Sequence, residues 1–260
     1  AFDLMQTVKN DPKWFCQVLT VEDTKALSDE SLEEARKEMP QDLFQQEYFC
    51  KFLDNGLGFF RRVDENTYKT EDYTPKELAF YQIGVDLAKY NDYTVITPFN
   101  LNDFHVLKQD SFNQMDYNLQ KARIENTYLR LNKGRIVMDS TGVGEPVFDD
   151  LNSRGINIEP FRFNKTSRTD LLKNLQILLE QDKIKIPNDE VLIDELKSMT
   201  YELNQNGNTV IKVPDGKHDD RIMSLALAVW QIPQNPIHVN AYNRSVQTGG
   251  VEPFYAEFGI

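Results

Sequence analysis

Three short acidic motifs in this sequence could bind metal ions. Asp86 and Asp139 each follow a run of apolar residues, and Asp219 and Asp220 stand together before a third apolar segment. A carboxylate is costly to bury unpaired, so an aspartate at the end of an apolar strand must reach solvent or a cation. Helix capping alone would account for the last pair. It does not account for the two strand-end aspartates, so the motifs together predict a carboxylate cluster.

The chemistry of such a cluster is that of a magnesium or manganese site. Carboxylate oxygens are hard donors that suit Mg²⁺ or Mn²⁺, and no set of Cys or His residues suited to zinc is evident. Phosphodiester hydrolysis by two such ions about 4 Å apart needs one bridging carboxylate and others on either side. We expect Asp86 to bridge both ions, Asp139 to bind one, and Asp219 or Asp220 to bind the other.

Two further residues adjoin these motifs. Asp92 follows Asp86 by six residues, and His218 directly precedes the acidic pair. Both are candidates for an outer shell around the metal ligands. The simpler interpretations are a turn aspartate and a positional histidine.

The basic residues and the net charge bear on a nucleic-acid substrate. The net charge is −12, which disfavours tight non-specific binding to phosphates. Two divalent ions would add about four positive charges at the acidic motifs. The densest basic cluster is a candidate for tracking DNA phosphates, although a solvated helix start explains it equally well. It consists of Arg162, Lys165, Arg168 and Lys173.

The elements that must position these residues alternate between strand and helix patterns. Strands are expected at residues 81–86, 93–99, 104–108, 135–139, 156–163 and 183–186. Helices are expected at residues 113–131, 146–152, 169–181, 190–198 and 219–231. A hairpin is expected from strands 199–203 and 209–213 around a turn at 204–208. Three successive strands imply an antiparallel meander, and the order β-β-β-α-β-α-β predicts an RNase H-like mixed sheet flanked by helices.

The last helix has a phase that would orient the acidic pair. Asp219 lies three residues before Ile222 and seven before Ala226, so a helix starting at Asp219 would turn it toward the same inward face. Asp220 would lie at the edge of that face. We therefore expect Asp219 to be the inward member of the pair.

The two ends of the chain differ from this middle part. Residues 1–72, with an expected strand at 14–19 and an acidic helix at 28–39, are too broken to form a complete domain. Residues 235–260 lack periodicity and are expected to be a tail. Neither a targeting segment nor a membrane span is visible, which favours an intracellular protein. Cys16 and Cys50 lack metal-site spacing and are interpreted as buried free thiols.

The three motifs, taken in order, resemble those of the nuclease domain at the C-terminus of the large terminase subunit of tailed bacteriophages. The matching segments are residues 84–88 with 92–94, 138–144 and 218–226, and the resemblance covers about residues 73–234. It implies metal-dependent cleavage of concatemeric double-stranded viral DNA during packaging, in the cytoplasm of the infected bacterial host. It assigns catalytic metal binding to Asp86, Asp139, Asp219 and Asp220.

The same resemblance implies partners and a missing motor. Residues 44–50 resemble the segment that follows the packaging ATPase, so residues 1–72 would be the end of that ATPase domain and its linker. The portal protein, the small terminase subunit and the rest of the ATPase domain would be partners. No GxxxxGK[ST] motif occurs in the chain, so ATP hydrolysis by this chain alone is not expected.

Three other functions remain open at this point. A Holliday-junction resolvase or transposase-type nuclease would use the same fold. An actin-like sugar kinase would use the glycine loops at residues 84 and 142–144 for phosphate, but it needs a duplicated half that the sequence lacks. A non-catalytic motor-docking module would leave the aspartates purely structural.

Overall fold

The computed structural model describes residues 13–15, 17–51, 58–74, 78–88, 92–142, 144–203, 209–214, 216–233 and 236. The chain divides into two compact units. The first unit comprises residues 1–57 and 201–210, and the second comprises residues 58–200 and 211–260. The expected boundary at residue 72 thus differs from the structural one. Residues 58–72 pack with the second unit through the buried side chains of Phe59, Phe60 and Val63.

The second unit is built on a mixed sheet with the strand order β4-β3-β2-β6-β7. Its strands are β2 (Tyr81–Asp86), β3 (Thr94–Asn100), β4 (His105–Val106), β6 (Arg135–Asp139) and β7 (Ile158–Phe161). β3 runs antiparallel to β2 and β4, whereas β6 runs parallel to β2 and β7. This is the expected antiparallel meander extended by parallel strands.

The third strand of the meander is shorter than expected. The segment expected at 104–108 forms β4 and is followed by β5 (Asp110–Phe112), and both pair with β3. β5 takes residues 110–112, and the helix α5 (Tyr117–Arg130) begins behind its N-cap Asp116. The Asp116 carboxylate accepts hydrogen bonds from Asn118 and Leu119, which explains why the helix begins later than residue 113.

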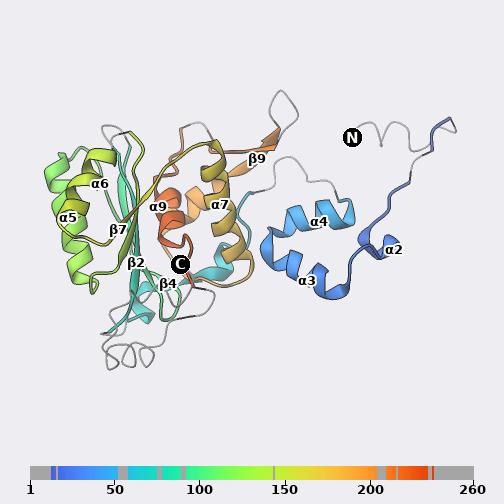
Figure 1. Ribbon diagram of the computed structural model, residues 1–260, viewed down its shortest axis with the longest axis horizontal. Coiled ribbons are helices and arrows are strands. Elements are labelled where there is room, and N and C mark those ends of the chain that lie inside the picture. The colour runs from blue at the N-terminus through green and yellow to red at the C-terminus, as the bar shows by residue number, and fades with distance from the viewer. Residues whose placement is uncertain are drawn as a thin grey trace. The chain divides into compact units, whose positions relative to one another are not determined.

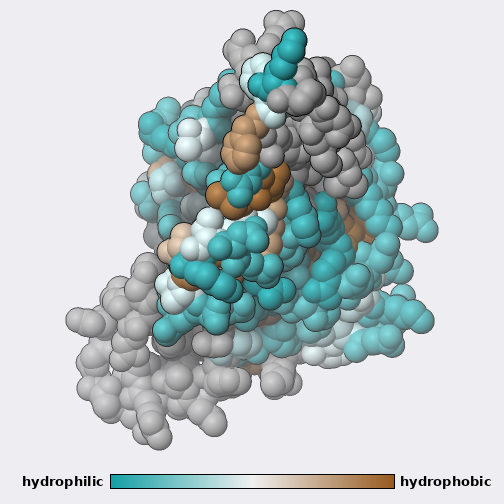
Figure 2. All heavy atoms as spheres, turned by 90° about the vertical axis from the view of Figure 1, so that its right-hand side faces the viewer, coloured by the Kyte–Doolittle hydropathy of each residue, from teal (hydrophilic) through white to brown (hydrophobic). Residues whose placement is uncertain are grey.

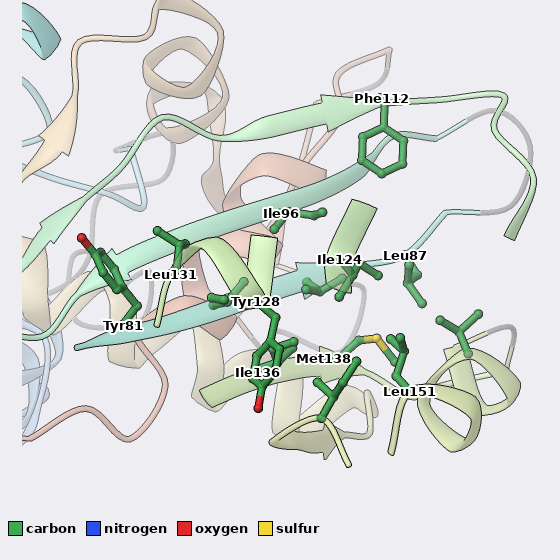
Figure 3. Close-up of a cluster of buried hydrophobic side chains, with 14 of the residues drawn as sticks. Tyr81, Leu87, Ile96, Phe112, Ile124, Tyr128, Leu131, Ile136, Met138 and Leu151 are labelled. Atoms are coloured by element: carbon green, nitrogen blue, oxygen red, sulfur yellow. The ribbon is translucent and has the colours of Figure 1, made fainter. Parts of the chain in front are cut away.

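Helices cover both faces of the sheet (Figure 1). α5 and α6 (Gly144–Ser153) lie on one face, where they enclose a core cluster. Figure 3 shows that cluster, with Ile136 and Met138 of β6 facing Ile124 of α5 and Leu151 of α6. Tyr81, Ile83, Val85 and Leu87 belong to it as well. Because side chains alternate along a strand, Gln82, Gly84 and Asp86 must face the opposite side of the sheet.

The opposite face carries α9 (Asp220–Ala228), with α7 (Lys165–Glu180) and α8 (Glu190–Ser198) packed against α9. All residues of α9 from Ile222 to Ala228 are buried. α9 approaches β2 so closely that a Cβ on Gly84 would lie 2.0 Å from the Ser224 carbonyl oxygen. Glycine is therefore required where β2 passes under α9.

Shorter elements complete the described part of the chain. β8 (Ile186–Pro187) pairs in parallel with β1 (Thr67–Tyr68), flanked by the 3₁₀ turns Asp64–Asn66 and Thr70–Asp72. β9 (Thr200–Leu203) and β10 (Thr209–Lys212) pair as the expected hairpin. The expected turn at 204–208 lies outside the described residues. The predicted tail at 235–260 also lies outside them except for residue 236.

The first unit contains α2 (Val21–Thr24), α3 (Asp29–Glu38) and α4 (Gln41–Phe49). The acidic helix expected at 28–39 is confirmed, with Ser28 as its N-cap. The strand expected at 14–19 is wrong for the residues described there, since Trp14, Phe15, Val18 and Leu19 are exposed and outside any strand. An apolar run alone does not form a strand, because a strand needs a neighbour for its hydrogen bonds.

Three features of the described residues remain: the hydropathy of their surface, the absence of a membrane-spanning helix among them, and the cysteines. On the face drawn in Figure 2, the described residues are mostly hydrophilic, with smaller groups of apolar residues between them. No helix among the described residues is long and apolar enough to span a bilayer. Cys50 is a free thiol whose Sγ lies 3.4 Å from the Leu19 carbonyl oxygen, but it is exposed, so the expectation of a buried thiol is wrong there. Cys16 is outside the described residues.

Candidate active site

The sheet places Asp86 and Asp139 side by side. They follow Val85 and Met138, which are register partners on the adjacent parallel strands β2 and β6. Parallel strands end at the same edge of a sheet, so the two carboxylates meet there. Both belong to the set of side chains that faces α9, since Val85 and Met138 point into the core on the other face. The sequence-based expectation of two aspartates at corresponding strand ends matches this arrangement.

The start of α9 supplies the other two aspartates, but not in the expected orientation. α9 begins at Asp220, and Asp219 is its N-cap with the non-helical angles φ −126° and ψ 10°. The helical phase therefore does not extend back to Asp219, and the expectation that Asp219 is the inward member is wrong. The Asp220 side chain is 16% exposed and that of Asp219 is 28% exposed. Asp220 is thus the more deeply placed carboxylate.

Burial raises the pKa values of the strand-end aspartates, and neighbouring carboxylates add to this for Asp86. Burial, followed by the charges of Asp220, Asp139 and Asp219, raises the pKa of Asp86 well above its usual range. Burial likewise raises the pKa of Asp139, although the Thr141 N–H donates to its Oδ1 at 2.8 Å and opposes this shift. A group of buried like charges that resists ionisation is an environment that a cation would relieve.

Burial also raises the pKa of Asp220. The opposing contribution comes from the Tyr93 N–H, which donates to Asp220 Oδ2 at 3.0 Å. Tyr93 precedes β3, so this bond ties the first turn of α9 to the loop that follows β2. No sequence pattern pointed to this backbone donor.

Asp92 and His218 lie beside Asp220. Asp92, His218 and Asp220 each place one possible ligand atom within 4.8 Å of the others. His218 Nδ1 lies 3.8 Å from Asp92 Oδ1 and 3.7 Å from Asp220 Oδ2. The two residues expected to form an outer shell therefore lie together beside Asp220. One imidazole and two carboxylates suit Mn²⁺ or zinc as well as harder ions.

Polar contacts hold α9 in place over the sheet. The buried Ser224 hydroxyl lies 3.0 Å from the Gly84 carbonyl oxygen and 2.7 Å from the Thr97 hydroxyl. Gln109 donates at 2.9 Å to the Arg221 carbonyl, and Gln82 donates at 2.6 Å to the Trp230 carbonyl. These bonds fix the distance between Asp220 and the strand ends.

Glu195 of α8 is a buried acidic residue that the sequence analysis missed. It is 7% exposed, and its Oε2 has no hydrogen-bond partner among the described residues. The Arg221 backbone N–H hydrogen-bonds to its carboxyl group. Burial is the main cause that raises its pKa to about 8, and the charges of Asp220 and Asp219 add to this. Its position beside the buried Leu196 and three residues after the buried Leu192 was the available signal, since that is the inward face of α8.

Replacing Glu195 with Gln should change how stability depends on pH. The folded chain holds the Glu195 proton up to about pH 8, whereas the unfolded chain releases it near pH 4.5. The stability that protonated Glu195 contributes is therefore fully present below its pKa in the unfolded chain. It is lost as the pH rises through its pKa in the folded chain. The free energy of unfolding, measured in urea, should fall for both proteins as the pH rises from about 5 to about 9. For Glu195→Gln this fall should be about 2–4 kcal/mol smaller than for wild type.

Glu190→Gln, on the exposed side of the same helix, is the matched control for that measurement. It should follow the wild-type curve. An unchanged pH dependence for Glu195→Gln would contradict the raised pKa of Glu195.

The basic cluster divides into residues inside and outside the site. Arg168, near the start of α7, forms an ion pair with Asp219 Oδ2. Arg162 follows β7 and pairs with Glu145 at 2.9 Å, on an exposed rim next to Asp139 in the strand register. Lys165 is exposed and Lys173 is half-buried on α7. The structure therefore brings one of the four basic residues directly to the aspartates.

The donor set fits a divalent cation. Asp86, Asp139 and Asp220 supply hard oxygen atoms. Burial raises the pKa of all three, and for Asp86 the charges of Asp220, Asp139 and Asp219 raise it further. Hard oxygens in this number are typical of Mg²⁺ or Mn²⁺ sites. A cation bound by these side chains would also offset part of the net charge of −12.

Comparison with known proteins identifies relatives of this chain. Residues 83–231 match the family model of the terminase RNaseH-like domain. The large terminase subunit of Thermus virus P23-45 is 30% identical over 209 residues, which are 76% of this chain and 43% of that protein. The chain therefore spans less than half the length of that curated relative.

Two solved structures are similar across the second unit. The magnesium-bound large terminase nuclease of thermophilic phage G20c has a TM-score of 0.63 and 27% identity, covering 68% of this chain and 99% of that one. The cobalt-bound form of the same nuclease has a TM-score of 0.62 and 26% identity over the same shares.

Proposed function

This chain belongs to the terminase family, whose RNase H-like domain it contains, and we propose that it is a divalent-metal-dependent endonuclease that cuts concatemeric double-stranded viral DNA during genome packaging. The observation that carries the proposal is the convergence of Asp86, Asp139 and Asp220 at one edge of the sheet. The G20c nuclease structures with bound magnesium and bound cobalt support a divalent metal in this domain.

The aspartates would bind different metal ions according to their positions. Asp86 lies among Asp220, Asp139 and Asp219, and it would serve two ions, with Asp139 as a ligand of one and Asp220 as a ligand of the other. Asp92 and His218 adjoin Asp220 and would complete its side of the site. Divalent ions held there would supply the charge that activates water and stabilises the leaving 3′ oxygen in phosphodiester hydrolysis.

The protein's own contribution is to hold these groups rigidly. Buried hydrogen bonds from Ser224 and Gln109 fix α9 against the strands, so the carboxylates are arranged before substrate arrives. The Thr141 and Tyr93 N–H groups orient the Asp139 and Asp220 carboxylates. The exposed Arg162 and Lys165 would contact DNA phosphates from the rim.

We extend the proposal to the biological setting on the same family basis. The chain would act in the cytoplasm of the infected bacterial host, with the portal protein, the small terminase subunit and the packaging ATPase as partners. Its residues before Gly58 would be the end of that ATPase domain.

A plasmid-cleavage assay tests the proposal. Supercoiled plasmid should be nicked and linearised with Mn²⁺ or Mg²⁺ and should stay intact in chelator, since the carboxylates need the ions for activity. Asp139→Ala should lower the rate by about a hundredfold or more, the order of effect expected when an essential electrostatic group is lost.

The same assay separates the alternatives. Activity that survives chelator or Asp139→Ala would contradict the proposed site. Faster cutting of four-way junctions than of linear duplex would instead favour a resolvase. Absence of cleavage under every metal condition would favour a non-catalytic docking role.

A further inference from the structure

The ion pair between Arg168 and Asp219 links the basic cluster to the metal site. Asp219 is the N-cap of α9, yet its side chain makes no capping hydrogen bond and instead binds the Arg168 guanidinium. Asp219 thus differs from Asp116, Asn164 and Asp189, whose side chains cap their helices. The Asp219 carboxylate, which could have capped α9, instead forms an ion pair with Arg168 of α7.

The position of Arg168 is set by the start of α7. Asn164 accepts hydrogen bonds from the Thr166 and Ser167 N–H groups, and Ser167 Oγ accepts one from the Asn164 N–H. This capping box fixes the first turn, and Arg168 follows it directly. Leu171 and Leu172 anchor the next turn in the core. Arg168 therefore reaches Asp219 from a rigid helix and not from a loop.

Both partners of this ion pair retain access to solvent. The side chain of Arg168 is 34% exposed and that of Asp219 is 28% exposed. A guanidinium has five N–H donors in a planar fork that matches carboxylate and phosphate groups. Arg168 uses Nη2 for Asp219, so it can turn its fork toward another anion at the same rim without leaving α7.

We propose that Arg168 is the counterion of Asp219 in the metal-free site, and that Asp219 exchanges it for a divalent ion as Arg168 turns to a DNA phosphate. This inference rests on the proposed function, because it requires metal and DNA at the same edge of the sheet. It explains why an arginine stands among carboxylates that are expected to bind cations. Arginine and cation compete for one carboxylate, so metal binding and phosphate binding by Arg168 are coupled.

Metal affinity gives the first test, measured by calorimetric titration of Mn²⁺ into the full 260-residue chain. Arg168→Gln should bind Mn²⁺ about threefold to tenfold more tightly than wild type, because a partly exposed ion pair that competes with the metal is gone. Arg154→Gln removes the same charge from another ion pair, whose partners are Glu125 and Asp150, so its Mn²⁺ affinity should match wild type. Equal or weaker Mn²⁺ binding by Arg168→Gln would overturn the competition.

DNA affinity gives the second test, measured by fluorescence anisotropy of a labelled short duplex with Ca²⁺ or with chelator. Ca²⁺ is a hard cation that takes the same oxygen ligands. Arg168→Gln should weaken duplex binding about fivefold in Ca²⁺ and change it little in chelator, where wild-type Arg168 is held by Asp219. A loss of equal size in both conditions would show a contact independent of metal and would overturn the coupling.

A second variant and the wild-type reference keep the outcomes distinct. Arg168→Lys keeps the charge without the fork, so its Mn²⁺ affinity should lie between those of wild type and Arg168→Gln. Wild type that binds no Mn²⁺ would overturn both this inference and the proposed function. Wild type that binds Mn²⁺, with Arg168→Gln indistinguishable from it, would overturn this inference alone.

Discussion

Replacing Asp86 with Asn is expected to lower the rate of DNA cleavage by about a thousandfold or more, the order of effect seen when a central electrostatic group is lost. Asp86 lies within the fields of Asp92, Asp139, Asp219 and Asp220, so its carboxylate is central to the proposed metal site. An Asn keeps its size and removes its charge. The rate is measured on supercoiled plasmid with Mn²⁺.

The same substitution should make the metal-free protein more stable. Burial and like charges raise the pKa of Asp86 in the folded chain, so its ionised form opposes folding as the pH rises above the ordinary range of an aspartate. Without metal at neutral pH, Asp86→Asn should gain about 1–3 kcal/mol in free energy of unfolding. The increase in melting temperature that Mn²⁺ gives the wild-type protein should be lost or greatly reduced.

Asp149→Asn is the matched control, since Asp149 is an exposed aspartate on α6. It should cleave DNA and respond to Mn²⁺ as wild type does. Cleavage by Asp86→Asn within tenfold of wild type, or lower stability of its metal-free form, would contradict the account of the cluster.

Replacing Gly84 with Ala is expected to have the largest effect on stability. Its Cβ would lie 2.0 Å from the Ser224 carbonyl oxygen and 2.4 Å from the Ala228 nitrogen. Both are backbone atoms of the buried helix α9, so the steric clash cannot be relieved by moving a side chain. We expect a loss of about 3 kcal/mol or more in free energy of unfolding, at the upper end of overpacking effects. Any folded fraction should also bind Mn²⁺ weakly, since α9 carries Asp220.

Gly58→Ala provides the comparison for this variant. A Cβ there would meet its nearest atom, the Phe60 carbonyl oxygen, at 3.7 Å, an ordinary van der Waals distance. It should change the free energy of unfolding by less than about 1 kcal/mol in the same urea titration. Similar losses for the two variants would contradict the close approach of α9 to β2.

The strand-end aspartates were predictable because local pattern determines them. Ile83 and Val85, like Ile136 and Met138, are apolar residues of strands that stop at an aspartate, and the parallel pairing of β2 and β6 brings those ends together. The strand predicted at 14–19 failed for the opposite reason. Its apolar residues supply a local pattern, but a strand also needs a partner that the local pattern does not specify.

The details of the third motif could not be read from periodicity. Helix phase predicts the direction of a side chain only inside a helix. α9 begins one residue later than the pattern suggested, so Asp220, and not Asp219, is the more deeply buried of the pair. The Arg168 ion pair and the Tyr93 hydrogen bond join segments 51 and 127 residues apart in the chain. Contacts of that kind depend on tertiary packing, whereas Glu195 was visible as an acidic residue on the inward face of α8.

The central claim is that Asp86 and its neighbours bind the catalytic cation. The most direct measurement is anomalous diffraction at the manganese edge, from crystals of the full chain soaked in Mn²⁺. The account predicts one or two manganese peaks bound by Asp86, with Asp139 or Asp220 as a second ligand. Manganese bound elsewhere, with the Asp86 carboxylate unliganded, would contradict it.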